Sequence, residues 1–173
     1  LDDWDLYALK LVNRARHDPA GEAAPLGSDV VDTTLPRPPL AFHPLVGNAA
    51  TNHNNWMHNN FGNINTPDGP DSFTHYETMN GLPGGTPATS TPGFTGVEVA
   101  HRLTAAGFNW DRAAESIITL VSTETISIDP MLIEENHWLW WESDGHRAGL
   151  RSPEYTVFGH RIESRAFVPP RGG

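Results

Sequence analysis

The chain has 173 residues, a formal net charge of −10 at neutral pH, no cysteine, and 38% hydrophobic residues that include six tryptophans and seven phenylalanines. This composition is typical of one globular domain with a substantial core and does not suit a disordered chain. The negative charge disfavours binding to nucleic acid or to an anionic lipid surface. Without cysteine there can be no disulfide and no Cys-ligated zinc, and the sequence has no apolar run long enough to cross a membrane.

The first half of the chain predicts two helices separated by a loop. An aspartate at position 2 or 3 can cap a helix whose apolar residues recur at helical spacing and which ends before Pro19. Residues 21–39 are polar and Pro-rich, so we expect a loop there. Residues 44–60 carry a single apolar stripe and predict the second helix.

A long loop is expected next, over residues 61–96, because Pro and Gly are frequent there and periodicity is absent. Its acidic and amide side chains are of the kind that binds calcium: Asn63, Asn65, Asp68 and Asp71. With Gly69 at the turn position of an EF-hand, however, loop positions one and three would be Ile64 and Thr66. The EF-hand pattern therefore fails, and a solvated turn is preferred over a different type of calcium loop.

The second half predicts four more elements. In chain order we expect a helix that Gly107 ends, a short element over residues 113–121, a helix over residues 131–142 with Pro130 in its first turn, and an alternating strand over residues 155–163. Neither an internal repeat nor a domain boundary is evident.

Three segments carry the strongest functional signal: Phe73-Thr74-His75, Glu115-Ser116-Ile117 and Trp140-Trp141-Glu142-Ser143-Asp144-Gly145-His146-Arg147. In this order and spacing they resemble the signature segments of the CAP superfamily (cysteine-rich secretory proteins, antigen 5 and plant pathogenesis-related proteins), in its bacterial, cysteine-free branch. The resemblance extends over about residues 6–162. We therefore expect one CAP-type domain over residues 1–173.

The resemblance implies an α+β fold: a three-layer α-β-α sandwich with a small antiparallel sheet and long irregular loops. It also implies an open cleft lined by two histidines and two glutamates. His75, Glu115 and His146 match three of these four positions. The fourth position falls on Ser143, and the neighbouring Glu142 would point about 100° away on a helix. Both residues are kept as cleft candidates.

The chemistry of such a cleft has several possible forms. Two imidazoles and a carboxylate suit Zn²⁺, so His75, His146 and Glu115 are candidate metal ligands, with Zn²⁺ or Ca²⁺ as the candidate ion. A bound Zn²⁺ could activate water for hydrolysis. Without a metal, a carboxylate beside a histidine forms a pH-responsive pair. The three side chains could also simply hydrogen-bond one another and hold the cleft together.

Other aromatic residues favour structural interpretations. His53 lies on the apolar stripe of the second helix and is predicted to be a satisfied core residue. His137 could reach the cleft, whereas His160, in the predicted strand, is expected to pack or to lie at the surface. The last predicted helix carries three tryptophans that we expect to face mainly the core and not to form a platform for a sugar or lipid: Trp138, Trp140 and Trp141.

The resemblance also implies a location and a function. We expect a secreted or periplasmic bacterial protein, whose leader is not part of this chain. The preferred function is an extracellular binding module for a lipid, sterol, glycan or peptide, assisted by a divalent cation. The alternative is a metal-dependent hydrolase or peptidase that uses the same cleft, and a third possibility is a structural surface protein with a vestigial cleft. The sequence leaves the oligomeric state open.

Overall fold

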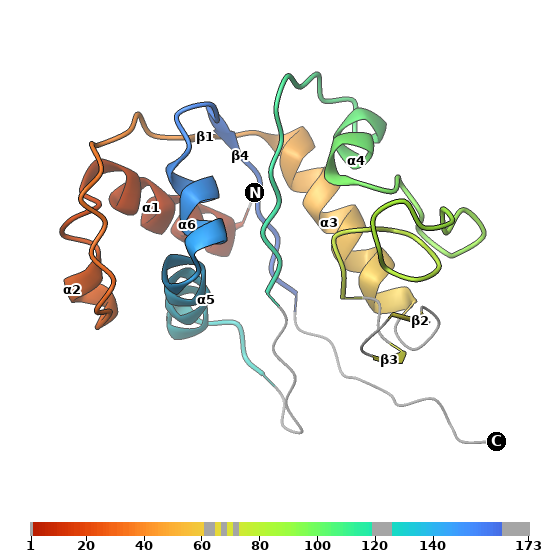
Figure 1. The fold of residues 1–173 in the computed structure, drawn as a ribbon, viewed down its shortest axis with the longest axis horizontal. Helices are drawn as coiled ribbons and strands as arrows, with labels where there is room; N and C mark the ends of the chain where they lie inside the picture. The colour runs from red at the N-terminus through yellow and green to blue at the C-terminus, as the bar shows by residue number, and fades with distance from the viewer. Residues whose placement is uncertain (1, 61–64, 67–68, 71–72, 119–125, 164–173) are drawn as a thin grey trace.

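The computed structural model describes residues 2–60, 65–66, 69–70, 73–118 and 126–163 (Figure 1). The fold is mixed α and β and mostly helical, as the predicted α+β class requires. Its elements are α1 (Asp3–His17), α2 (Ala23–Leu26), β1 (Ala41–Phe42), α3 (Pro44–Asn59), β2 (Asn65–Thr66), β3 (Gly69–Pro70), α4 (Val99–Ala105), α5 (Pro130–Glu142), α6 (Asp144–Arg151) and β4 (Val157–Phe158). None of the described helices is long and apolar enough to span a membrane.

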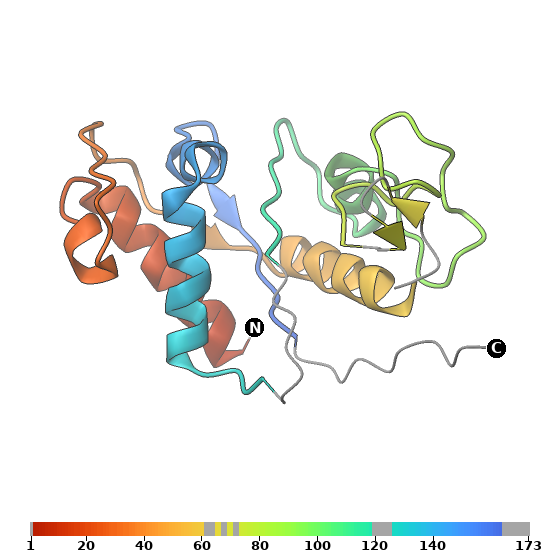
Figure 2. The same ribbon diagram turned by 60° about the horizontal axis from the view of Figure 1, so that its bottom comes forward.

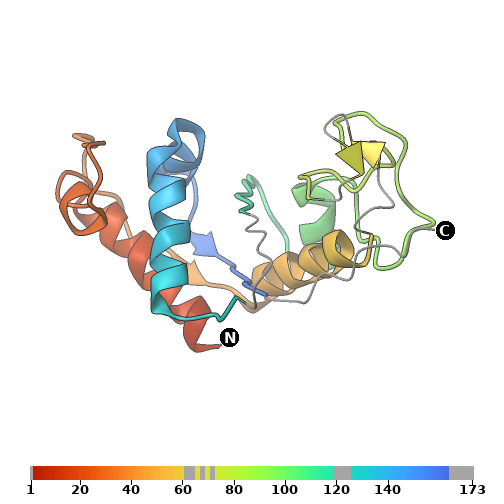
Figure 3. The same ribbon diagram turned by 90° about the horizontal axis from the view of Figure 1, so that it is seen from below.

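The larger helices form two groups on either side of the β1–β4 pair (Figures 1 and 3). In one group α1 packs against α5 and α6, and in the other α3 packs against α4. Figure 2 shows the β1–β4 pair and the extended segment that follows α4 between the two groups. Of the candidate site residues, Glu142, Ser143 and His146 lie in or between α5 and α6, whereas His75 and Glu115 lie in the irregular segments before and after α4.

The pairing of β1 with β4 differs from the sequence prediction. The two strands run parallel, with Ala41 opposite Val157, whereas the expected sheet was antiparallel. The chain between them contains α3, α4, α5 and α6 and returns to the pair in the original direction, which is a crossover connection typical of parallel strands. Antiparallel pairing among the described residues is limited to β2 with β3 and to one bridge, between Thr78 and Pro87. A small antiparallel sheet between helical layers is therefore not confirmed.

Helix-capping signals predicted three helices correctly. Asp2 caps α1 in a capping box with Asp5. α3 and α5 begin at Pro44 and Pro130, where the missing N–H of proline is not needed. α4 is shorter than expected, and the chain leaves it at Gly107, which has a φ of 81°.

Other elements were predicted wrongly or not at all. α2 lies within the expected loop over residues 21–39, and α6 follows α5 directly because extended Ser143 ends one helix and caps the next. The predicted strand over residues 155–163 is reduced to β4, and residues 113–118 form neither helix nor strand. Residues 119–121 of that predicted element lie outside the described residues, as do three of the four candidate calcium ligands, Asn63, Asp68 and Asp71.

The core consists of three apolar clusters. One joins α1, α5 and α6, and a second joins α1 and α5. The third surrounds the C-terminal half of α3, where Trp56 and Met57 pack with Ala88. Trp140 and Trp141 are buried, and Trp138 is 37% exposed. The prediction that these tryptophans mainly serve the core is therefore confirmed.

Candidate functional site

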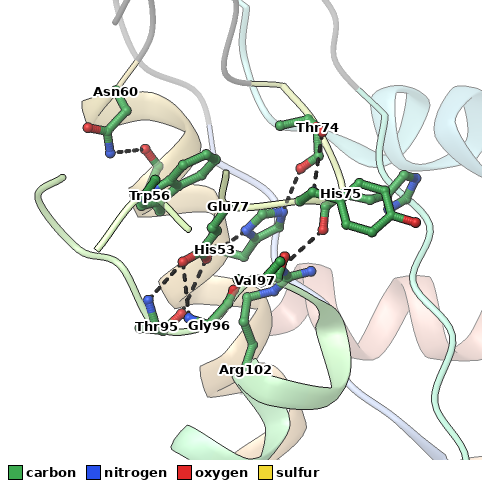
Figure 4. A network of polar contacts seen from close by, with 12 residues as sticks. His53, Trp56, Asn60, Thr74, His75, Glu77, Thr95, Gly96, Val97 and Arg102 are labelled. Carbon is green, nitrogen blue, oxygen red and sulfur yellow. Dashed lines mark hydrogen bonds and ion pairs between the residues drawn. The ribbon is translucent and has the colours of Figure 1, made fainter. Parts of the chain in front are cut away.

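His75 and Glu115, which lie 40 residues apart in the sequence, meet in the structure. Nδ1 of His75 is 2.9 Å from Oε2 of Glu115. Arg102, on α4, donates from Nη2 to both oxygens of the same carboxylate, at 2.6 and 2.7 Å. It also donates to the main-chain oxygen of His75 at 3.1 Å (Figure 4). Glu115 is thus fixed between a buried guanidinium and a half-exposed imidazole.

The electrostatics of this trio keep Glu115 ionised. Burial alone would raise the pKa of the Glu115 carboxyl, but the hydrogen bond from His75 and the positive charges of His53 and Arg102 outweigh it, so the pKa lies below its ordinary value. An ionised carboxylate has about four acceptor positions. The contacts from Arg102 and His75 use three of them, so one acceptor position remains for another donor.

A second pair is formed by His53 and Glu77, which Figure 4 shows side by side. Nδ1 of His53 is 3.0 Å from Oε1 of Glu77, and its Nε2 is 2.9 Å from the main-chain oxygen of Thr74. Since both partners are acceptors and a neutral imidazole has a single N–H, the two contacts are hydrogen bonds when the pair is an imidazolium and a carboxylate. Glu77 also accepts from the main-chain N–H groups of Thr95 and Gly96.

The second pair also lies close to the Glu115 carboxylate. Nε2 of His53 lies 3.9 Å from Oε2 of Glu115, and the His53 and Glu77 side chains are 2% and 0% exposed. The prediction that His53 is a satisfied core residue is confirmed. The structure adds that the positive charge of His53 helps to lower the pKa of Glu115.

His146 lies in the first turn of α6 and is half-buried. Burial, and then the positive charge of His75, lower the pKa of His146 below its ordinary value, which places the two imidazoles within electrostatic range. The described part of the chain contains no group of three His, Asp or Glu side chains arranged to hold a metal ion. A cation at Glu115 would also have to displace Arg102 from both carboxylate oxygens. Metal binding by His75, His146 and Glu115 stays a prediction that requires this displacement.

The two remaining cleft candidates serve the helices around them. Glu142 accepts a hydrogen bond from the hydroxyl of Ser28, and Ser143 caps α6 by accepting from the main-chain N–H of His146 at 3.5 Å. The carboxylate that joins this polar network is Glu77, through His53.

His137 and His160 have acidic partners of their own. Nε2 of His137 is 2.8 Å from Glu22, which also binds Arg14, so His137 belongs to a separate buried cluster between α5 and α1. His160 is buried, with Nδ1 3.2 Å from Asp5. His160 therefore packs in the interior, as expected for a structural residue.

A cavity of about 1060 Å³ adjoins Glu115. Its lining comes from α3, α4, α5, α6, residues 108–118 and residues 154–163. His53, Arg102 and Glu115 contribute polar groups from α3, α4 and the segment after α4, and further charged residues line the cavity elsewhere: Asp111, Arg112, Glu154, Arg161 and Glu163. Much of the remaining surface is apolar and includes Ala50, Met57, Leu103, Ile117, Trp140 and Phe158. His75 and His146 are not among the described lining residues.

Sequence reasoning missed Arg102 and Glu77, which hold the site together. Arg102 lies in a short helix beside the buried Leu103, and helical periodicity does not distinguish a buried arginine from a solvated one. Glu77 follows His75 by only two residues, inside the expected loop, and its proximity was the one available signal.

Comparisons with known proteins add no further assignment: no family model matches the chain, and no curated protein or solved structure matches it significantly. The CAP resemblance thus rests on the motif residues themselves.

Proposed function

We propose that this chain is a secreted or periplasmic binding module of the CAP type, whose cavity takes an apolar ligand of the lipid or sterol class. The observation that carries this proposal is the largely apolar cavity of about 1060 Å³ beside the Arg102–Glu115 pair. Small-molecule sites are concave, of roughly 300–1,000 Å³, and mainly apolar with a few placed polar groups. The apolar lining favours a lipid or sterol over a glycan.

Arg102 and Glu115 indicate the kind of ligand head group that the cavity would accept. Arg102 and Glu115 neutralise each other, so the cavity offers no uncompensated charge at this point for a charged ligand. The remaining acceptor position of Glu115 suits a hydroxyl donor. A ligand with an apolar body and a neutral hydroxyl head, such as a sterol, suits both the apolar lining and the acceptor position of Glu115.

Support for the CAP assignment comes from two features. The resemblance implies that the segments of His75 and Glu115 face one cleft, and these side chains are 2.9 Å apart. It also implies helical layers on both sides of strands, and α1, α5 and α6 lie across the β1–β4 pair from α3 and α4 (Figure 3). An α-β-α sandwich remains our proposal for the complete domain.

Titration with the fluorescent sterol dehydroergosterol tests the function, with energy transfer from tryptophan as the signal because Trp140 lines the cavity. We expect saturable binding to the wild-type protein. Ala50→Phe, which fills the cavity from α3, should weaken binding at least tenfold. Ala105→Phe, the same change at an exposed position of α4, should leave binding unchanged. Absence of saturable binding to the folded wild-type protein would refute the proposal.

A further inference from the structure

A second pocket, of about 710 Å³, lies on a different face of α6. Its α6 lining residues follow helical spacing: Asp144, Arg147, Ala148 and Arg151. Gly149 and Leu150, on another face of the same helix, line the cavity described above. Residues 31–34, Arg37 and residues 152–154 complete the second pocket. The two pockets therefore use different faces of α6, and they adjoin at Glu154, which lines both.

Arginine side chains concentrate around this pocket. Arg37, Arg147 and Arg151 line it, and the buried Arg16 lies close behind them. Arg16 donates to main-chain oxygens only: those of Pro38, Leu150, Ser152 and Tyr155. Burial, and then the positive charges of Arg151 and Arg37, lower the pKa of Arg16. The structure thus collects positive charge here although the whole chain is acidic.

The carboxylates of the pocket compensate this charge only in part. Asp32 binds Arg151 at 3.2 Å. Asp144 binds Arg147, but its side chain is 94% exposed, so water screens that pair. Glu154 is bound by Arg112, outside the pocket lining. Of the three arginines that line the pocket, Arg37 alone has no carboxylate partner among the described residues. Together with the buried Arg16 behind the lining, it leaves a formal excess of two positive charges.

Arg37 is the arginine of the pocket whose side chain has no hydrogen bond or ion pair within the described part of the chain. Its side chain is half-buried, and its Nε is buried without a hydrogen-bond partner among the described residues. A buried donor without a partner is costly, so it marks a place where a ligand oxygen would be stabilised. The pocket also presents hydroxyl groups beside Arg37, on Thr33, Thr34 and Ser152.

From this geometry we infer that the pocket binds a phosphate group, with Arg37 as its principal ligand. A guanidinium matches phosphate oxygens with paired N–H donors, and a phosphate carries about −1.5 to −2 charges at neutral pH, which matches the excess charge of the pocket better than one carboxylate does. The volume exceeds that needed for the free ion, so a small phosphomonoester fits as well as inorganic phosphate.

The test is calorimetric titration of the full chain with inorganic phosphate and, separately, with glycerol 3-phosphate, at low ionic strength. We expect millimolar or tighter binding that weakens as salt is added. Arg37→Gln should weaken it at least tenfold, and Arg37→Lys, which keeps the charge but loses the paired donors, should weaken it less. Lys10→Gln removes one positive charge from an exposed position outside the pocket and should change affinity less than twofold.

Each outcome of these titrations either supports or overturns phosphate binding by the pocket. Tighter binding of glycerol 3-phosphate supports it and indicates a phosphomonoester, and equal binding supports it with phosphate itself as the ligand. Absence of binding to the folded wild-type protein overturns it. Equal weakening by Arg37→Gln and Lys10→Gln also overturns it, because the effect is then one of overall charge. Sterol binding by the other cavity is unaffected by any of these results.

Discussion

Arg102→Ala is the substitution that best tests the polar site. Arg102 is 1% exposed and binds both oxygens of Glu115, whose side chain is 16% exposed. It also donates to the main-chain oxygens of His75, Gly96 and Val97. Its removal leaves a largely buried carboxylate without its main partner and frees the contact between α4 and the segment of His75.

The magnitude follows from this burial. Breaking a buried ion pair by removing one partner costs about 3–5 kcal/mol. Since Glu115 retains some exposure and can be partly rehydrated, we expect the lower end, a loss of about 3 kcal/mol in the free energy of unfolding. The double variant Arg102→Ala/Glu115→Gln should recover part of this loss, because no uncompensated charge remains.

Urea denaturation at neutral pH measures the change as a shift in midpoint at constant slope. Arg112→Ala is the matched control, because Arg112 forms an ion pair with Glu154 but is 66% exposed. Its cost should stay below about 1 kcal/mol. If Arg102→Ala costs no more than Arg112→Ala, or if adding Glu115→Gln recovers nothing, the buried pair does not exist as described.

Two further predictions concern packing and pH. A Cβ on Gly159 would lie 2.4 Å from main-chain atoms of α3, so Gly159→Ala should lower the free energy of unfolding by about 1–3 kcal/mol. Gly149 lies in open space on α6, so Gly149→Ala should raise the free energy of unfolding by up to about 1 kcal/mol. Equal effects of the two substitutions in urea denaturation would contradict the close approach of Gly159 to α3. The lowered pKa values of Glu115, Glu22 and His146 each favour the deprotonated form in the folded protein, so their stabilisation is complete above about pH 6.5. It is lost as the pH falls, first through the pKa of His146 and then through those of the two carboxyls; a melting temperature that rises on acidification to pH 4, close to the ordinary pKa of a glutamate, would show the sign to be wrong.

Local signals predicted those parts of the fold that depend on neighbouring residues. Caps and prolines predicted the starts of α1, α3 and α5 because a helix start depends on residues within one turn. The parallel pairing of Ala41 with Val157 was not predicted, since it depends on where the intervening chain places two short strands.

The candidate site likewise combines residues that the sequence predicted with residues that only the structure revealed. The CAP-like motifs identified His75 and Glu115, which do meet. They could not identify Arg102, whose role depends on α4 packing beside the segment of Glu115. They also predict a metal, because two imidazoles and a carboxylate suit Zn²⁺, but they give no sign that Arg102 binds that carboxylate.

Photolabelling with a diazirine derivative of cholesterol tests the proposed ligand site most directly, because it reports where the sterol lies. We predict that labelled peptides map to α3 and α5, around Met57 and Trp140, and that excess unmodified cholesterol abolishes the labelling. Labelling confined to exposed apolar residues outside the cavity lining, such as Val31 and Leu35, and insensitive to that excess would contradict a sterol-binding cavity.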